Sequence, residues 1–271
     1  MAVKLIAVDM DGTFLDDKKQ YNKARFLAQY AEMKAQGIRF VVASGNQYWQ
    51  LISFFPEIRD EIAFVAENGA YVVNQGEEVF CGAFTDEQAL MVMDELLPLS
   101  DVTTVVCGKN SAYISDQADE SVVAIMSRHY HRLEPVADLR QVRDTLFKFA
   151  LNLPEDDSAR LRGALGHRLD GIIKPVSSGF GFVDLIIPGL HKANGIQRLQ
   201  QQWQIGDEEV VAFGDSGNDE EMLRKAGFSF AMENARPEIK AVAKYAAGHH
   251  NQQSVLDVID DVLAGRGLFA G

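Results

Sequence analysis

Apolar and amphipathic stretches alternate towards both ends of the chain. Short apolar runs rich in β-branched residues are typical of strands buried in a parallel sheet, and they lie at 5–8, 38–43, 63–66, 209–213 and 228–232. Stretches with apolar residues at helical spacing lie between and after these runs, at 22–36, 47–55, 192–203, 220–225, 237–243 and 253–263. The alternation predicts an α/β fold in which helices cover a parallel sheet.

The residues between 85 and 188 show a different pattern. Helical stretches at 85–97, 119–131 and 155–165, the last ended by Gly166, are mixed with apolar strands at 103–107, 112–115, 146–153, 171–176 and 182–187. Strands joined by short turns indicate antiparallel pairing, so we expect a separate α+β domain inserted into the first one. The glycine-rich tip at 177–181 could face a substrate, and a flexible hairpin is the alternative.

Two carboxylates follow the first strand, where open α/β sheets bind ligands. Asp9 and Asp11 lie on the same side of the pleat, and Gly12 permits a tight turn directly after them. Two anions about 4 Å apart repel by roughly 4 kcal/mol at an effective dielectric constant near 20. A proton, a lysine or a cation must compensate this repulsion, and Mg²⁺ suits because it prefers oxygen ligands.

Polar residues also follow the next two strands. Ser44, Gly45 and Asn46 lie between a strand and a helix. This arrangement either binds an anion through free backbone N–H groups or caps the helix. Asn68-Gly69 between two apolar runs predicts a hairpin turn near the same edge of the sheet.

Further charged residues appear in the last third of the chain. Lys192 begins a helix, and Asp215 and Asp219 follow the strand at 209–213. His129 and His131 are two positions apart on a predicted helix and would face different directions, so we interpret them as surface residues rather than metal ligands.

Composition narrows the classes of partner. The chain has 271 residues with 26 basic and 39 acidic side chains, a net charge of −13, which argues against nucleic acids and anionic membrane surfaces. Two cysteines imply no disulfide framework. The apolar run before Asp9 is too short for a signal peptide, and no run of 18 apolar residues occurs, so we expect neither a signal peptide nor a membrane-spanning segment. We therefore expect a cytoplasmic protein, and no pattern indicates its oligomeric state.

Taken in chain order, the strand-end residues resemble the four motifs of the haloacid-dehalogenase superfamily. Asp-Met-Asp-Gly-Thr at 9–13 matches the first motif and Val-Ala-Ser-Gly at 42–45 the second. Lys192 matches the third, and Gly-Asp-Ser-Gly-Asn-Asp at 214–219 matches the fourth in the form used by Cof-type phosphatases. The resemblance covers essentially the whole chain and is closest to bacterial sugar phosphatases. At Asn46 the chain departs from the Arg found in many Cof-type relatives.

The resemblance implies a fold and a division into domains. It implies a Rossmann-like doubly wound parallel sheet as the catalytic core, formed by residues 1–84 and 189–271. Residues 85–188 would form an inserted α+β cap of the C2 type, which excludes water and selects the leaving group.

The resemblance also implies a Mg²⁺-dependent hydrolysis of small phosphate monoesters, most simply hexose or pentose phosphates. Asp9 would be the nucleophile that forms a phosphoaspartyl intermediate, and Asp11 would protonate the leaving group and then activate water. Lys192 would stabilise the nucleophile and the phosphoryl oxygens, and the phosphoryl group would be bound by Ser44, Gly45, Lys192 and Asn218.

The same resemblance implies the metal ligands. Mg²⁺ would be held by Asp9, by the backbone carbonyl of Asp11 and by Asp215, with Asp219 behind them orienting a metal-bound water. Two other functions fit the motifs: a sugar phosphomutase or phosphotransferase on the same fold, and a non-catalytic sugar-phosphate binding protein. The intact pair of Asp9 and Asp11 argues against the binding protein, because binding requires no acid or base.

Overall fold

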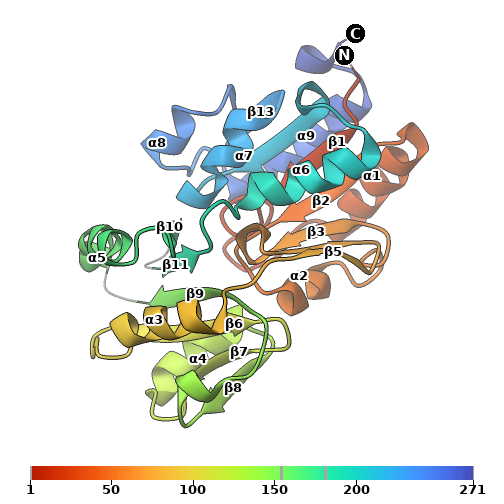
Figure 1. Ribbon diagram of the computed structural model, residues 1–271. Helices are drawn as coiled ribbons and strands as arrows, with labels where there is room; N and C mark the ends of the chain where they lie inside the picture. The colour runs from red at the N-terminus through yellow and green to blue at the C-terminus, as the bar shows by residue number, and fades with distance from the viewer. Residues whose placement is uncertain (1, 153–154, 180–181, 271) are drawn as a thin grey trace.

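The computed structural model describes residues 2–152, 155–179 and 182–270. These residues include two β-sheets, one towards each end of the molecule (Figure 1). Within these residues the larger sheet has eight strands in the order β14-β13-β12-β1-β2-β3-β4-β5. The strands are β1 (Leu5–Val8), β2 (Arg39–Ala43), β3 (Ala63–Ala66), β4 (Tyr71–Asn74), β5 (Glu77–Cys81), β12 (Val210–Gly214), β13 (Phe228–Ala231) and β14 (Tyr245–Ala246). Strands from β14 to β3 are parallel, whereas β4 and β5 run antiparallel.

Helices cover both faces of this sheet, as expected for a doubly wound fold (Figure 1). Helices α6 (Lys192–Trp203) and α7 (Glu220–Lys225) pack together on one face, and α1 (Lys23–Gln36) and α9 (Ser254–Leu263) pack together on the other. Helices α2 (Tyr48–Phe54) and α8 (Pro237–Lys240) follow β2 and β13. Every residue of β1 is fully buried, which explains its uninterrupted apolar sequence. The predicted α/β fold is confirmed.

The second sheet forms the inserted cap. Its order is β10-β11-β9-β6-β7-β8, from β6 (Thr103–Gly108), β7 (Ala112–Ser115), β8 (Leu133–Val136), β9 (Leu146–Asn152), β10 (Lys174–Gly179) and β11 (Phe182–Ile186). Helices α3 (Asp86–Leu96) and α5 (Glu155–Arg168) pack on one face, and α4 (Glu120–His129) packs on the other. The exact domain boundaries, 1–84 with 189–271 and 85–188, stay a prediction.

Three local details differ from the sequence-based expectation. Helix α5 does not end before Gly166 but continues to Arg168, because Gly166 does not adopt the left-handed conformation of a helix cap. Strand β8 has no alternating pattern and was not expected; it pairs with β7 at the edge of the cap sheet. Strand β10 extends to Gly179, and the remainder of the predicted tip, residues 180–181, lies outside the described residues.

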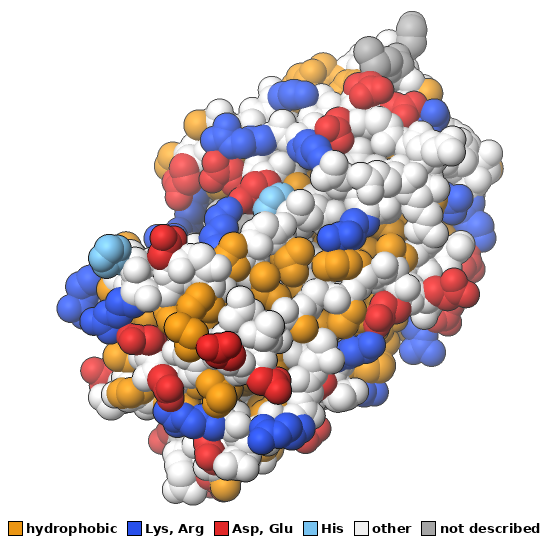
Figure 2. Space-filling model, viewed as in Figure 1, with side chains coloured by type: hydrophobic (Ala, Val, Ile, Leu, Met, Phe, Trp, Pro, Cys, Tyr) orange, Lys and Arg blue, Asp and Glu red, His pale blue; other side chains and the backbone are white. Residues whose placement is uncertain are grey.

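The surface carries charges of both signs. Figure 2 shows Lys and Arg side chains interspersed with Asp and Glu side chains over both domains on the face drawn. Among the described residues, no helix combines the length and the apolar character needed to cross a bilayer.

Candidate active site

The carboxyl ends of β1, β2, β3 and β12 meet at the edge of the sheet that faces the cap (Figure 1). Asp9 extends β1 by a hydrogen bond from its backbone N–H to the carbonyl of Phe213, at 3.1 Å, and its side chain is buried. The chain then turns at Gly12, whose φ is +76°. A Cβ atom there would lie 2.7 Å from the Asp215 carboxylate, so glycine is required by close approach as well as by backbone conformation.

Lys192 is fully buried beneath Asp9. Its ammonium group donates to Oδ1 of Asp9 at 2.6 Å and to Oδ1 of Asp219 at 2.7 Å. Burial disfavours the charged amine, but the two carboxylates outweigh this effect and raise the pKa of Lys192. The predicted lysine therefore lies in contact with the predicted nucleophile.

Asp219 organises the loop that follows β12. Its Oδ2 accepts hydrogen bonds from the backbone N–H groups of Asp215, at 2.9 Å, and Ser216, at 3.0 Å. Asp215 in turn accepts from the hydroxyls of Thr13, at 3.2 Å, and Ser216, at 3.1 Å. Both oxygens of Asp219 are thus engaged, whereas Asp215 is oriented towards the first motif.

The charges of this cluster are unbalanced. Asp9, Asp215 and Asp219 bring carboxylate oxygens within 4.8 Å of one another, and one ammonium group, that of Lys192, lies among them. Burial raises the pKa of Asp9 more than Lys192 lowers it, and burial together with Asp219 raises the pKa of Asp215 to about 6. A hard divalent cation would supply the missing charge, and the oxygen donors of Asp9 and Asp215 fit Mg²⁺.

The second motif lies beside this cluster. Ser44 is buried, its backbone N–H donates to the carbonyl of Val65 at 2.9 Å, and its hydroxyl accepts from the N–H of Asn46 at 3.1 Å. Helix α2 begins later, with Gln47 as its cap, so Ser44 is not the helix cap. Ser44, Gly45 and Asn218 line the same cavity as Asp9 and Asp11.

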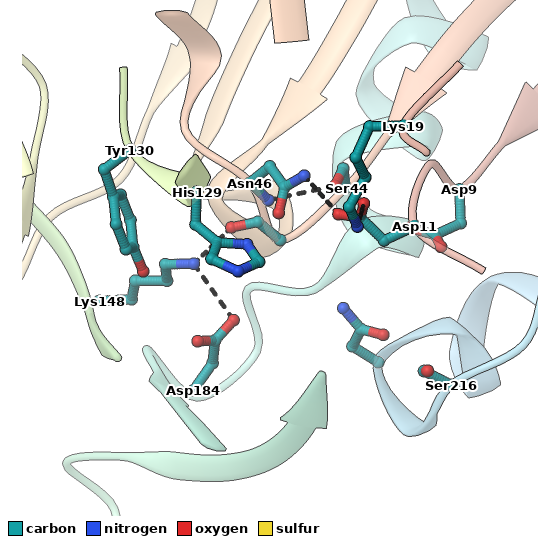
Figure 3. Close-up of a pocket in the computed structure, with 12 residues that line it drawn as sticks. Asp9, Asp11, Lys19, Ser44, Asn46, His129, Tyr130, Lys148, Asp184 and Ser216 are labelled. Carbon is teal, nitrogen blue, oxygen red and sulfur yellow. Dashed lines mark hydrogen bonds and ion pairs between the residues drawn. The ribbon is translucent and has the colours of Figure 1, made fainter. Parts of the chain in front are cut away.

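Asp11 has partners on both oxygens of its carboxylate. The ammonium group of Lys19 binds Oδ1, and the side-chain amide of Asn46 donates to Oδ2 at 2.7 Å (Figure 3). Burial works against ionisation of Asp11, but Lys19 and Asn46 outweigh it and lower the pKa. The sequence analysis did not single out Lys19, because nothing in its local pattern places it beside Asp11.

The cap supplies the opposite wall of the cavity, which has a volume of about 60 Å³. His129, Tyr130, Lys148 and Asp184 line it from the cap side (Figure 3). The interpretation of His129 as a surface residue is wrong: the end of α4 directs its ring into the cavity, where burial lowers its pKa. His131 is exposed, as expected.

A buried polar network joins the cap to the core. The ammonium group of Lys148 binds the carbonyl of Gly45, and lies 3.2 Å from Asp184 and 3.3 Å from Glu67. Asp184 accepts from the amide of Asn68 at 2.7 Å, and Asn68 accepts from Asn218 at 2.9 Å. Asn68 has φ 55° in the turn after β3, so it is both the predicted turn residue and a link in this network.

The sequence pattern around Lys148 and Asp184 could have identified both as candidate site residues. Lys148 lies between Phe147 and Phe149, and Asp184 lies between Val183 and Leu185, each a single charge within an apolar strand. Because side chains alternate across a strand, both project from the face opposite α3 and α5, towards the core.

Comparison with known proteins agrees with this geometry. The family model described as haloacid dehalogenase-like hydrolase matches residues 6–259. The chain is 56% identical over 263 residues to the 5-amino-6-(5-phospho-D-ribitylamino)uracil phosphatase YbjI of Escherichia coli (strain K12), covering 97% of each chain. It is 24% identical to the phosphatase YitU of Bacillus subtilis (strain 168), named for the same substrate, covering 93% of this chain and 94% of the relative.

A solved structure, that of SMU.1108c from Streptococcus mutans UA159, superposes with a TM-score of 0.93 at 35% identity, covering 97% of this chain and all of the other. The chain therefore belongs to the haloacid dehalogenase-like hydrolase family. Within that family it is a Cof-type phosphatase, an enzyme that hydrolyses phosphoric monoesters.

The shared ammonium group of Lys148 predicts a pH-dependent contribution to stability. Glu67 and Asp184 share one cation, and burial raises the pKa of Glu67 from 4.5 to about 7. The contribution of protonated Glu67 to the free energy of unfolding is fully present below about pH 4.5. It is lost as the pH rises through 7, which lowers the free energy of unfolding by about 3 kcal/mol. The side chain of Glu67→Gln stays neutral at every pH. We therefore expect the free energy of unfolding of this variant, relative to that of the wild type, to be higher at pH 8 than at pH 5.

Denaturant unfolding at both pH values measures this difference. The exposed carboxylate variant Glu134→Gln, on β8, is the matched control and should show no comparable change between the two pH values. An equal difference between Glu67→Gln and wild type at pH 5 and pH 8 would contradict the assignment.

Proposed function

We propose that this phosphatase releases phosphate from small sugar or sugar-alcohol phosphates, with Asp9 as the nucleophile, Asp11 as the acid and base, and Mg²⁺ as cofactor. The observation that carries the proposal is the buried arrangement of Asp9 on Lys192, with Asp215 and Asp11 on either side. We also place the enzyme in the cytoplasm.

The first half of the reaction transfers the phosphoryl group to the enzyme. A carboxylate oxygen of Asp9 attacks phosphorus while the bond to the leaving oxygen breaks, and the protonated form of Asp11 gives that oxygen its proton and becomes a carboxylate. Lys192 favours the ionised form of Asp9 and holds the carboxylate in place through its 2.6 Å contact. Ser44 and Asn218, on the cavity wall, bind the phosphoryl oxygens.

The second half regenerates Asp9. A water molecule attacks the phosphorus of the phosphoaspartyl group, Asp11 takes its proton, and phosphate leaves as the Asp9 carboxylate re-forms. Bound Mg²⁺ would neutralise charge between Asp9 and the phosphoryl group. Asp9 and Asp215 would hold it, together with the backbone carbonyl of Asp11, while Asp219 keeps the Asp215 loop in position.

The relatives and the cavity support the substrate class. Two phosphatases similar to this chain are named for a phosphate carried on a ribityl chain, which is a sugar alcohol. The cavity of about 60 Å³ holds a phosphoryl group but is well below the roughly 300 Å³ at which small-molecule pockets begin. We therefore expect the cap to move away from the core to admit the rest of the substrate.

The nucleophile is tested with Asp9→Asn, which keeps the shape of the side chain but removes the attacking carboxylate. We expect phosphate release from ribose 5-phosphate and from 5-amino-6-(5-phospho-D-ribitylamino)uracil to fall by at least about 10³-fold, with folding retained. Free phosphate is measured against time, and circular dichroism checks the fold. Turnover by Asp9→Asn at the wild-type rate would contradict the mechanism.

Removal of divalent metal tests the cofactor. With excess chelator, phosphate release should fall to background, and added Mg²⁺ should restore it. The raised pKa values of Asp9 and Asp215 indicate negative charge that the protein does not neutralise, and this charge would otherwise repel the phosphate group of the substrate. Asp215→Asn should raise the Mg²⁺ concentration needed for half-maximal activity by at least about tenfold. Undiminished activity in chelator would rule out the metal's role.

A further inference from the structure

Both oxygens of the Asp11 carboxyl group accept hydrogen bonds from neighbouring side chains. Lys19 binds one of its oxygens and Asn46 the other, the second at 2.7 Å (Figure 3). Each carboxylate oxygen has two lone pairs, so both contacts leave a place for the proton that Asp11 transfers. Together they fix the rotation of the carboxyl group within the cavity.

Asn46 is itself held by the second motif. Its backbone N–H donates to the hydroxyl of Ser44 at 3.1 Å, and its carbonyl accepts from the N–H of Glu67 at 3.2 Å. The amide therefore projects from a backbone fixed on both sides, and its donor is aimed at Asp11 rather than towards the cap (Figure 3).

Lys19 is held in a comparable way. It has φ 59°, in the left-handed region, within a turn closed by Asp16. The N–H of Lys19 donates to the Asp16 carbonyl at 2.9 Å, and the Asp16 carboxylate accepts from the N–H groups of Lys18 and Gln20, both at 2.9 Å. This turn directs the Lys19 side chain back over Asp11.

We propose that Asn46 is a positioning residue for Asp11, acting with Lys19, and that it is not a contact for the leaving group. The inference rests on the proposed function, in which Asp11 transfers a proton to the leaving oxygen. Asn46 and Lys19 orient the carboxyl group so that its proton faces this oxygen when the bond to phosphorus breaks. The step itself is unchanged: Asp11 loses one proton and the leaving alcohol gains it.

The leaving group separates these two roles of Asn46. A phenol leaving group gains much from protonation, whereas 4-nitrophenolate leaves readily as an anion, and the two are similar in shape. Loss of orientation at Asp11 therefore slows phenyl phosphate more than 4-nitrophenyl phosphate. Loss of a contact to the substrate's hydroxyl groups would leave the ratio of the two aryl phosphates unchanged.

The experiment measures kcat/KM for phenyl phosphate, 4-nitrophenyl phosphate and ribose 5-phosphate in the Mg²⁺-loaded enzyme. This constant covers only the steps up to departure of the leaving group, so water attack does not obscure the comparison. Loss of either residue also raises the pKa of Asp11, so each enzyme is compared at its own pH optimum. For Asn46→Ala and Lys19→Met we expect the preference for 4-nitrophenyl over phenyl phosphate to rise at least about tenfold there, within the range that general acid catalysis contributes.

Two controls accompany these variants. Asn74→Ala removes an asparagine at the opposite edge of the sheet, beside Ala63, and should leave the preference unchanged. Lys19→Arg keeps the cation and should restore most of the wild-type preference. The double variant Asn46→Ala/Lys19→Met should lose less than the product of the single losses, because both residues act on one carboxyl group.

The outcomes distinguish the inference from the proposed function. An unchanged aryl preference in Asn46→Ala, with a loss confined to ribose 5-phosphate, would show that Asn46 contacts the substrate and would overturn the inference alone. A wild-type enzyme that releases phosphate from none of the three esters would contradict the proposed function, and the inference with it.

Discussion

The buried contact of Lys192 with Asp9 and Asp219 is the interaction on which the rest of the site depends. It joins α6 to the end of β1 and to the loop after β12, and β1 is far from the other two elements in the sequence. A buried ammonium group without partners would be very costly, and so would the carboxylates without it. The cluster therefore fixes the nucleophile and the Asp215 loop in one step, and its remaining negative charge defines the place for a cation.

A second buried lysine, Lys148, also contacts two carboxylates, at the boundary between the cap and the core. These carboxylates come from both domains, so one buried cation contributes to the docked arrangement of cap and core. The chain of hydrogen bonds from Lys148 through Asp184 and Asn68 reaches Asn218, which lines the same cavity as Asp9 and Asp11. In the proposed opening of the cap, these groups would gain contacts with water as they lose their contacts with one another. A small number of buried charges would thus stabilise the docked cap without preventing the movement that we propose for substrate entry.

The sequence predicts that the strand-end residues lie close together, because the carboxyl ends of parallel strands share one edge of the sheet. Asp9, Ser44 and Asp215 come together for this reason, and the insertion of the α+β domain follows from the change of pattern after residue 84. Lys19 and His129 were not predicted, because their positions depend on a turn conformation and on how the cap docks. Such placements are set by tertiary contacts that local patterns do not encode.

The central claim, that Asp9 carries the phosphoryl group during turnover, is tested most directly by trapping the intermediate. Borohydride reduces an acyl phosphate to an alcohol, so enzyme quenched during turnover of ribose 5-phosphate with Mg²⁺ should carry homoserine at position 9. Mass spectrometry of the peptide that contains residues 5–15 would show this change, and enzyme without substrate would not. Continued phosphate release with an unmodified Asp9, or with reduction at another carboxylate, would contradict the account.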